Sequence, residues 1–289
     1  MLLFYSISDY LVYFTTYCIE AREHDVQVLS MCLMPDHTHD SVIVQKPDEL
    51  WHFKQDFNSR FARTQNAVFG RKGRLLEKPF GSAPKYGSKA VRTNLIYVGN
   101  NPVERKLCIR AEEYRWNLLA YSQSKNPFSK PLVIRKASCP MKKAVKEVKL
   151  TFDDSRPMTY YQLQRLFKPL NREEKEQLTD FIISTYNVVD YKVAIDYFGS
   201  YNNMLLAMHS TTGSEHDIKE TFVGKSDIYY SQMISIVLRE TKVRDIHKIL
   251  SWDDEKKFRL FMLLKHELPA TDRQIAKFLR MPVPKLARP

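Results

Sequence analysis

Hydrophobic positions in the first fifty residues change from helical to strand-like spacing. Apolar residues recur at helical spacing over 9–24 and predict a helix there. Two short β-prone runs follow at 26–34 and 41–45, and Pro35 and Asp36 break the first of them. This pattern predicts two strands in a hairpin-like pair.

Helical spacing returns after the hairpin. Phenylalanines and other apolar residues share one side over 48–69, which predicts a second long helix. A further helix is expected over 90–100, ending before Pro102, because the residue before a proline is disfavoured in the α region. This order predicts an α+β fold in which helices cover one face of an antiparallel sheet.

The second half of the chain has a different pattern. Residues 125–149 contain eight basic residues, one acidic residue and three prolines, so we interpret them as a basic linker. From residue 150 onward strand alternation is lost and helical patterns follow one another. The sequence therefore predicts an α+β domain at 1–124, the linker, and an all-helical domain at 150–289. The helices expected in that last domain cover residues 160–167, 172–186, 191–198, 202–208, 226–240, 253–266 and 272–279.

Charge narrows the class of partner. The 289 residues include 45 Lys and Arg against 33 Asp and Glu, a net charge of +12. Nucleic acid is the first partner that this excess favours, and a membrane surface the second. The alternative is a basic protein with no polyanionic partner.

Targeting and cysteine patterns point to a reduced compartment. The apolar stretch over 1–19 contains Asp9 and has no basic start, so we do not expect a signal peptide, and no other run is long enough to span a membrane. The four cysteines are far apart without a CxxC pair, which argues against a zinc knuckle or a disulfide framework. We expect a cytoplasmic protein without a membrane partner.

The sharpest local motif is MPDHTH, which places His37 and His39 two positions apart. Side chains at i and i+2 of a strand point to the same face. Two imidazoles on one face can ligate one metal ion, although the pair alone does not identify the metal. The simpler interpretation is a pair of polar histidines on an exposed strand or turn.

A second motif, YVGNNP, places Tyr97 and Asn101 four positions apart on the expected helix. At this spacing a phenol and an amide carbonyl lie side by side on one face. If two histidines and an amide oxygen hold a metal ion beside this tyrosine, the site is suited to attack of the phenolic oxygen on a phosphodiester. Taken alone, Tyr97 would favour the simpler interpretation of a tyrosine that packs at a helix end.

Together the two motifs resemble a known family. The run CLMPDHTH looks like the metal motif of the single-tyrosine HUH transposases, in particular the branch of REP-associated tyrosine transposases. The downstream string YVGNNPVERKLCIRAEEYRWNLLAY is similar to that branch's tyrosine helix and the segment after it. The order and spacing agree over about 26–121, which makes the resemblance far more specific than either motif.

The resemblance implies a fold, a reaction and a site. The implied fold is a ferredoxin-like antiparallel sheet with the histidines on a central strand. Tyr97 becomes the nucleophile, and His37, His39 and Asn101 become ligands of Mg²⁺ or Mn²⁺. The implied substrate is single-stranded DNA with hairpin or palindromic ends, which is cleaved and rejoined through a 5′-phosphotyrosine that leaves a free 3′-hydroxyl. Relatives occur as monomers and as homodimers, so the oligomeric state is open.

Some positions depart from the family pattern. Asp36 replaces the more usual Asn, and Thr38 replaces the hydrophobic residue between the histidines. Thr38 is expected to point away from the metal, and Asp40, on the same side of the strand, is not expected to be a ligand. The first strand of the implied sheet has to come from residues 2–6.

Basic residues beside the motifs are candidates for binding DNA. Between Arg60 and Arg110 twelve basic residues stand against two acidic ones, a net charge of +10. Such a patch supplies the phosphate-binding contribution to affinity, while Phe80 and Tyr86 can stack on unpaired bases. The alternative is a solvated basic face. The predicted DNA-binding residues here are Arg60, Arg63, Arg71, Lys72, Arg74, Lys78, Lys85, Lys89 and Arg92.

The end of the chain contains a possible second DNA-binding element. Residues 271–279 resemble the first helix of a helix-turn-helix, and the tail from Tyr229 resembles a domain of the replication-initiator type. Arg273 and Lys277 are its predicted DNA contacts. A plain helical bundle is the alternative.

We therefore predict a metal-dependent HUH transposase that acts on single-stranded DNA. Two other functions remain open. One is a decayed or domesticated protein that binds hairpin DNA without cutting it. The other is a rolling-circle type nickase, although such enzymes often carry a second tyrosine near the first and the expected helix holds only Tyr97.

Overall fold

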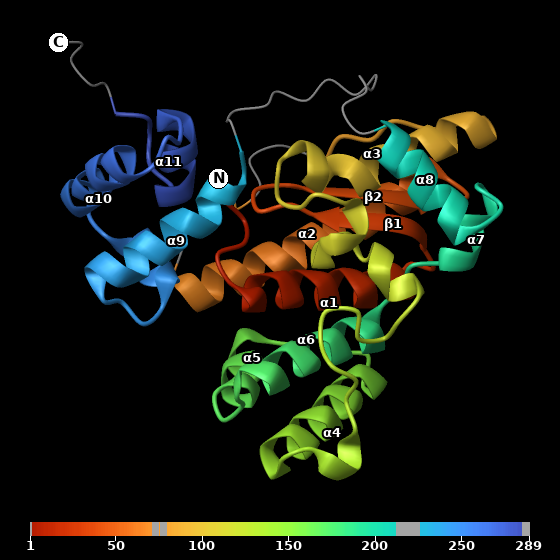
Figure 1. Ribbon diagram of the computed structural model, residues 1–289, viewed down its shortest axis with the longest axis horizontal. Coiled ribbons are helices and arrows are strands. Elements are labelled where there is room, and N and C mark those ends of the chain that lie inside the picture. The colour runs from red at the N-terminus through yellow and green to blue at the C-terminus, as the bar shows by residue number, and fades with distance from the viewer. Residues whose placement is uncertain (1, 71–74, 76–79, 212–225, 285–289) are drawn as a thin grey trace.

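The computed structural model describes residues 2–70, 75, 80–211 and 226–284. A short antiparallel sheet lies among helices, and the last three helices form a group beside the N-terminus (Figure 1). The helices and strands are α1 (Ile7–Glu23), β1 (Gln27–Leu33), β2 (Thr38–Ile43), α2 (Pro47–Phe69), α3 (Gly87–Glu104), α4 (Cys139–Asp153), α5 (Tyr160–Phe167), α6 (Arg172–Tyr186), α7 (Tyr191–Asp196), α8 (Tyr201–Thr211), α9 (Ile228–Thr241), α10 (Asp254–Glu267) and α11 (Asp272–Leu279). Short 3₁₀ helices occupy Ala111–Glu113, Arg115–Asn117, Leu119–Ser122, Ile134–Lys136 and Ile246–Ser251.

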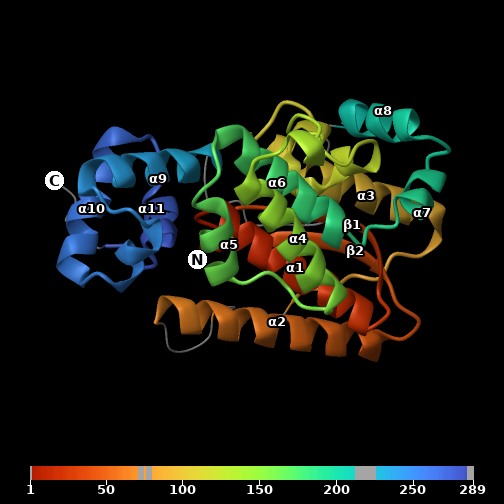
Figure 2. The ribbon, with the colours of Figure 1, turned by 90° about the horizontal axis from the view of Figure 1, so that it is seen from below.

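The two faces of the hairpin pack against different helices. Strands β1 and β2 are antiparallel, and Cys32 pairs with His39 in their register. Met31 and Leu33 pack in the large core that contains the apolar faces of α1 and α2. Cys32 lies in a separate apolar cluster with Tyr97 of α3. In Figure 2 the long helix α2 runs beside α1. Alternation along β1 therefore directs one set of side chains to α1 and α2, and the other set to α3.

The expected mixture of helices and an antiparallel sheet is confirmed. The order α1, β1, β2, α2 matches the inner part of a β-α-β-β-α-β unit, but the described residues contain two of its four strands. The ferredoxin-like arrangement therefore stays a prediction. The expectation that residues 2–6 form the first strand is wrong. The backbone N–H groups of Leu3 and Phe4 both donate to the Pro35 carbonyl, at 2.9 and 3.0 Å, so they bind the hairpin turn and form no strand ladder.

Helix α3 also differs from the prediction at its end. It continues through Pro102 to Glu104, although we expected it to stop before the proline. A proline removes one backbone donor, and near the end of a helix that loss affects only the last turn. The Pro102 side chain is buried, so burial of its ring helps to offset the lost hydrogen bond.

The segment predicted to be a basic linker contains most of helix α4. This helix buries Met141, Val145 and Val148 in the same large core as α1 and α2. Its lysines lie on the opposite, exposed face. The basic run is therefore the outer face of an amphipathic helix. The inner face of that helix belongs to a core that also contains residues from before the predicted boundary. The division at 124 and 150 stays a prediction.

The helices predicted for the second half are observed within a few residues of their expected ends, and an isolated bridge joins Val189 to Val28. Helices α9, α10 and α11 form what we call the C-terminal helical unit (residues 226–284), with its own apolar cluster. That cluster also contains Leu2 and Tyr5, so the N-terminus docks against the unit. The region after α11 where a recognition helix is expected falls largely outside the described residues.

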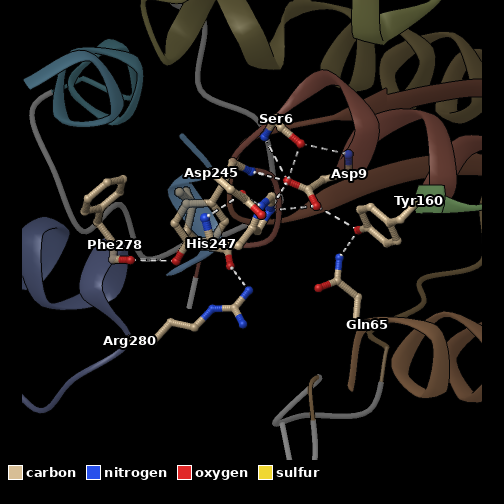
Figure 3. Close-up of polar contacts among 10 residues, drawn as sticks. Ser6, Asp9, Gln65, Tyr160, Asp245, His247, Phe278 and Arg280 are labelled. Atoms are coloured by element: carbon tan, nitrogen blue, oxygen red, sulfur yellow. Dashed lines mark hydrogen bonds and ion pairs between the residues drawn. The ribbon is translucent and has the colours of Figure 1, made fainter. Parts of the chain in front are cut away.

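A buried polar network ties the same unit to the start of α1 (Figure 3). The Asp9 carboxylate is fully buried and accepts hydrogen bonds from the backbone N–H groups of Tyr5 and Ser6, both at 2.8 Å, and from the Tyr160 hydroxyl at 2.7 Å. His247 donates to Asp9 through Nε2 at 2.9 Å and to Asp245 through Nδ1 at 2.7 Å. Burial lowers the pKa of His247, but the two carboxylates outweigh it and raise that pKa to about 9.

This network predicts a fall in stability on the alkaline side of neutrality. Because the pKa of His247 is higher in the folded chain than its ordinary value of 6.5, its contribution is complete below pH 6.5 and is lost as the pH rises through about 9. The shift corresponds to about 3 kcal/mol at most. Urea unfolding from pH 6 to pH 10 measures it, and His247→Gln is expected to flatten that part of the profile. Equal slopes for both proteins in this window would contradict the assignment.

Candidate active site

The hairpin brings the two histidines together at the start of β2. The Met34 N–H donates to the His37 carbonyl at 2.9 Å and closes the turn. The rings of His37 and His39 are nearly perpendicular, with centroids 4.8 Å apart. Thr38 lies on the other face, where its hydroxyl is 2.9 Å from the Tyr13 hydroxyl of α1. The prediction that Thr38 points away from the two imidazoles is therefore confirmed.

Asp40 lies away from the histidines as well. Its carboxylate accepts hydrogen bonds from Lys54 of α2 at 2.6 Å and from the Tyr17 hydroxyl of α1 at 2.7 Å. Both partners belong to the helices that cover the opposite face of the hairpin. This pairing satisfies the carboxylate inside the core, which agrees with our expectation that Asp40 is not a metal ligand.

Helix α3 brings the tyrosine and the asparagine to the same place. The Ser41 hydroxyl of β2 donates to the Asn94 side-chain oxygen, and this contact fixes α3 along the strand. Tyr97 and Asn101 follow on the same side of the helix. The ring centroids of Tyr97 and His39 are 5.4 Å apart, and the Asn101 Nδ2 is 3.1 Å from the His39 Nε2. Three residues predicted from the two motifs, His37, Tyr97 and Asn101, thus meet around His39.

Tyr97 is almost fully covered by its surroundings. Its side chain is 5% exposed and packs in an apolar cluster with Cys32, Met34 and Val98. A phosphate therefore reaches the phenol only if neighbouring side chains move.

The donor set around His39 fits a small divalent ion. The Asn101 amide lies 3.1 Å from the His39 Nε2, and an imidazole nitrogen that accepts a hydrogen bond at this place offers the lone pair that a metal ion needs. The Asn101 Oδ1 is buried and accepts no hydrogen bond from the described residues. Neighbouring ligand atoms of an octahedral ion lie about 3 Å apart when each bond to the ion is about 2.1 Å. A half-turn of the Asn101 amide exchanges Nδ2 and Oδ1, and Oδ1 would then lie at about this distance from the His39 Nε2. The described residues hold no group of three His, Cys, Asp or Glu that could bind a metal ion.

Two contacts near His37 were not predicted. The His37 Nδ1 donates to Asp36 Oδ1 at 2.5 Å, and Lys277 of α11 donates to Asp36 Oδ2. Burial raises the pKa of Asp36, but His37 and Lys277 outweigh it and hold that pKa well below its usual range. Asp227 is 3% exposed, and its pKa rises to about 6 because of burial and the nearby charge of Asp36. The local sequence around Asp36 contains no signal for Lys277, a partner about 240 positions away.

The predicted DNA-binding residues differ in their availability. Arg60 is paired with Glu20 at 2.8 Å and Lys277 with Asp36, and their DNA contacts stay predictions. Arg63, Lys89, Arg92 and Arg273 are exposed, and Lys85 is partly exposed. The predictions for Arg71, Lys72, Arg74 and Lys78 lie outside the described residues.

Comparisons with models of protein families, with curated proteins and with solved structures found no match for this chain. Across the part of the chain that the structure describes, no helix is both long and apolar enough to cross a membrane.

Proposed function

We propose that the protein is a metal-dependent transposase of the HUH type, which cleaves and rejoins single-stranded DNA near hairpins. One observation carries the proposal. Tyr97, His37 and Asn101 meet at His39, whose ring is 5.4 Å from that of Tyr97 and whose Nε2 is 3.1 Å from the Asn101 amide. A tyrosine beside candidate metal ligands suits transfer of a phosphodiester to that tyrosine.

In the proposed reaction Tyr97 is the nucleophile. Its phenolic oxygen forms a bond to the phosphorus and loses its proton, while the bond from phosphorus to the 3′ oxygen breaks and that oxygen takes up a proton. The products are a 5′-phosphotyrosine and a free 3′-hydroxyl. Because the phosphodiester energy is kept in the covalent link, a 3′-hydroxyl can attack it and rejoin the strands.

His37, His39 and Asn101 would hold Mg²⁺ or Mn²⁺ beside this phenol. When bound, the ion supplies charge withdrawal from a nonbridging phosphate oxygen. The chain's own contribution is to orient the ligands. The Asp36 carboxylate lies 2.5 Å from the His37 Nδ1, and a ring that donates through Nδ1 presents Nε2 to the ion.

A denaturing gel with hairpin-bearing oligonucleotides of randomised flanks tests the proposal. With Mg²⁺ or Mn²⁺, a 3′-labelled strand should migrate attached to protein, because the tyrosine retains the 5′ phosphate of the downstream piece. A 5′-labelled strand should be released shortened and extendable by terminal transferase. Native gels that show binding, together with denaturing gels that show no adduct for either label, would count against cleavage.

A hairpin-binding protein without cleavage is the second candidate. The near-complete burial of Tyr97 favours it, because a buried phenol is poorly placed for a phosphate. The same two gels separate this function from strand transfer.

The exposed basic residues at the start of α3 predict a salt effect. Lys89 and Arg92 are exposed, roughly two turns and one turn before Tyr97. Each phosphate contact on a single strand adds about 0.7 to the slope of log affinity against log salt. We expect Lys89→Ala with Arg92→Ala to reduce that slope by about 1.4. Fluorescence anisotropy over a salt series measures it, with exposed Lys256→Ala of α10 as the control, and an unchanged slope would exclude these contacts.

A further inference from the structure

The C-terminal helical unit reaches the hairpin turn that carries the two histidines. Lys277 of α11 forms an ion pair with Asp36 in that turn. Asp36 in turn accepts the hydrogen bond from the His37 Nδ1 at 2.5 Å. A continuous polar chain therefore runs from the last described helix to a candidate metal ligand. Its two ends are 240 positions apart in the sequence.

The position of α11 does not depend on this ion pair. The Tyr5 hydroxyl donates to the Phe278 carbonyl at 2.6 Å, and Arg280 donates to the Leu2 carbonyl at 3.1 Å. Leu2 and Tyr5 also pack in the apolar cluster of the unit. Loss of the Lys277 charge should therefore leave the unit docked.

Asp36 is a nearly buried carboxylate whose charge is balanced by Lys277. Its side chain is only 10% exposed, so water screens its charge poorly. A second buried carboxylate, Asp227, is close enough for its charge to act on Asp36. The positive charge of Lys277 lowers the pKa of both carboxyl groups and so offsets the repulsion between them.

We infer that Lys277 is a positioning residue, through which the C-terminal helical unit completes the candidate metal site by holding Asp36 on His37. The inference rests on the proposed function, because it assigns Lys277 to the same site. It replaces the expectation that Lys277 contacts DNA phosphate. Residues that orient a metal-ligating histidine typically change metal affinity by about 10- to 100-fold.

The affinity for Mn²⁺ alone tests this inference. Mn²⁺ is titrated into the full chain, and electron paramagnetic resonance measures the concentration of unbound ion. Lys277→Met removes the charge and keeps most of the stem, and it should weaken Mn²⁺ binding by about 10-fold. Charge alone predicts the opposite sign, because removal of a nearby cation strengthens the binding of another cation. Weaker Mn²⁺ binding by Lys277→Met would therefore indicate that Asp36 no longer holds His37 in place. Lys277→Arg should stay close to the wild type.

Two further variants make the test sharper. Lys265→Met removes another lysine of the same unit, which pairs with Asp272 at 3.0 Å, and should leave Mn²⁺ binding unchanged. Asp36→Asn removes the partner of Lys277, so Lys277→Met should have no further effect in that background. Nitrogen-15 NMR of labelled histidines should show His37 as the Nδ1–H tautomer in the wild type and as a mixture in Lys277→Met.

The outcomes separate this inference from the proposed reaction. Unchanged or tighter Mn²⁺ binding by Lys277→Met overturns the inference, as does a wild type that binds no Mn²⁺. Weaker DNA binding with normal Mn²⁺ binding also overturns it and returns Lys277 to a phosphate contact. A further outcome is that the wild type binds Mn²⁺ more tightly than Lys277→Met and yet forms no DNA adduct. That result would support the positioning role of Lys277 and show that the proposed reaction is wrong.

Discussion

Tyr97→Phe is expected to abolish covalent attachment to hairpin-bearing DNA, at least about 10³-fold in rate, while binding of the DNA is kept. The change removes one oxygen atom and keeps the ring. The contacts of that ring with Cys32 and Met34, and its edge-to-face contact with His39, should therefore remain. A loss of covalent attachment would therefore come from removal of the nucleophilic oxygen and not from altered packing. A denaturing gel with 3′-labelled strands measures the rate of attachment.

Tyr114→Phe is the matched control for this result. Tyr114 packs against the same apolar cluster, but its hydroxyl donates to the Leu33 carbonyl at 2.8 Å. We expect this variant to lose about 1 kcal/mol of stability from one buried hydrogen bond and to keep adduct formation. An adduct with Tyr97→Phe would show that another tyrosine is the nucleophile.

His39→Ala is expected to have the second largest effect. His39 contacts the His37 ring, the Tyr97 ring and the Asn101 amide. Its loss removes a ligand and leaves the other groups without their common neighbour. Several kcal/mol of charge stabilisation correspond to a rate loss of about 10² to 10³ or more, which added Mn²⁺ should not restore. Cleavage rates across a Mn²⁺ titration measure it, and His37→Ala should behave alike.

Two variants check this assignment. Thr38→Val changes the residue between the histidines, but Thr38 faces Tyr13 on the other side of the hairpin, so cleavage should continue. Asn101→Asp offers carboxylate oxygens in place of the amide and should retain cleavage, whereas Asn101→Ala should weaken it. If Mn²⁺ restores His39→Ala fully, His39 is not a ligand. If Asn101→Ala has no effect, the third ligand lies elsewhere.

Asp36 shows how a tertiary contact balances a charged side chain beside a candidate ligand. Its carboxylate lies 2.5 Å from the His37 Nδ1, and Lys277 of α11 supplies the opposite charge. Nothing in the local sequence around either residue indicates this pairing.

Local spacing predicted most of the elements and the composition of the candidate site. Periods of 3.6 and 2 in the apolar residues fix which side of a helix or strand becomes buried, so the helices and the hairpin followed from the sequence. The spacing of two between the histidines put both imidazoles on one face. The spacing of four did the same for Tyr97 and Asn101.

Only the tertiary structure decided what packs against what. It turned the basic run at 139–149 into the outer face of α4, placed the N-terminus against the C-terminal helical unit, and joined Asp36 to Lys277 and Asp9 to His247. The physical reason is that such pairs join residues more than 230 positions apart. Their formation depends on how whole helices pack and leaves no periodic signal in either segment.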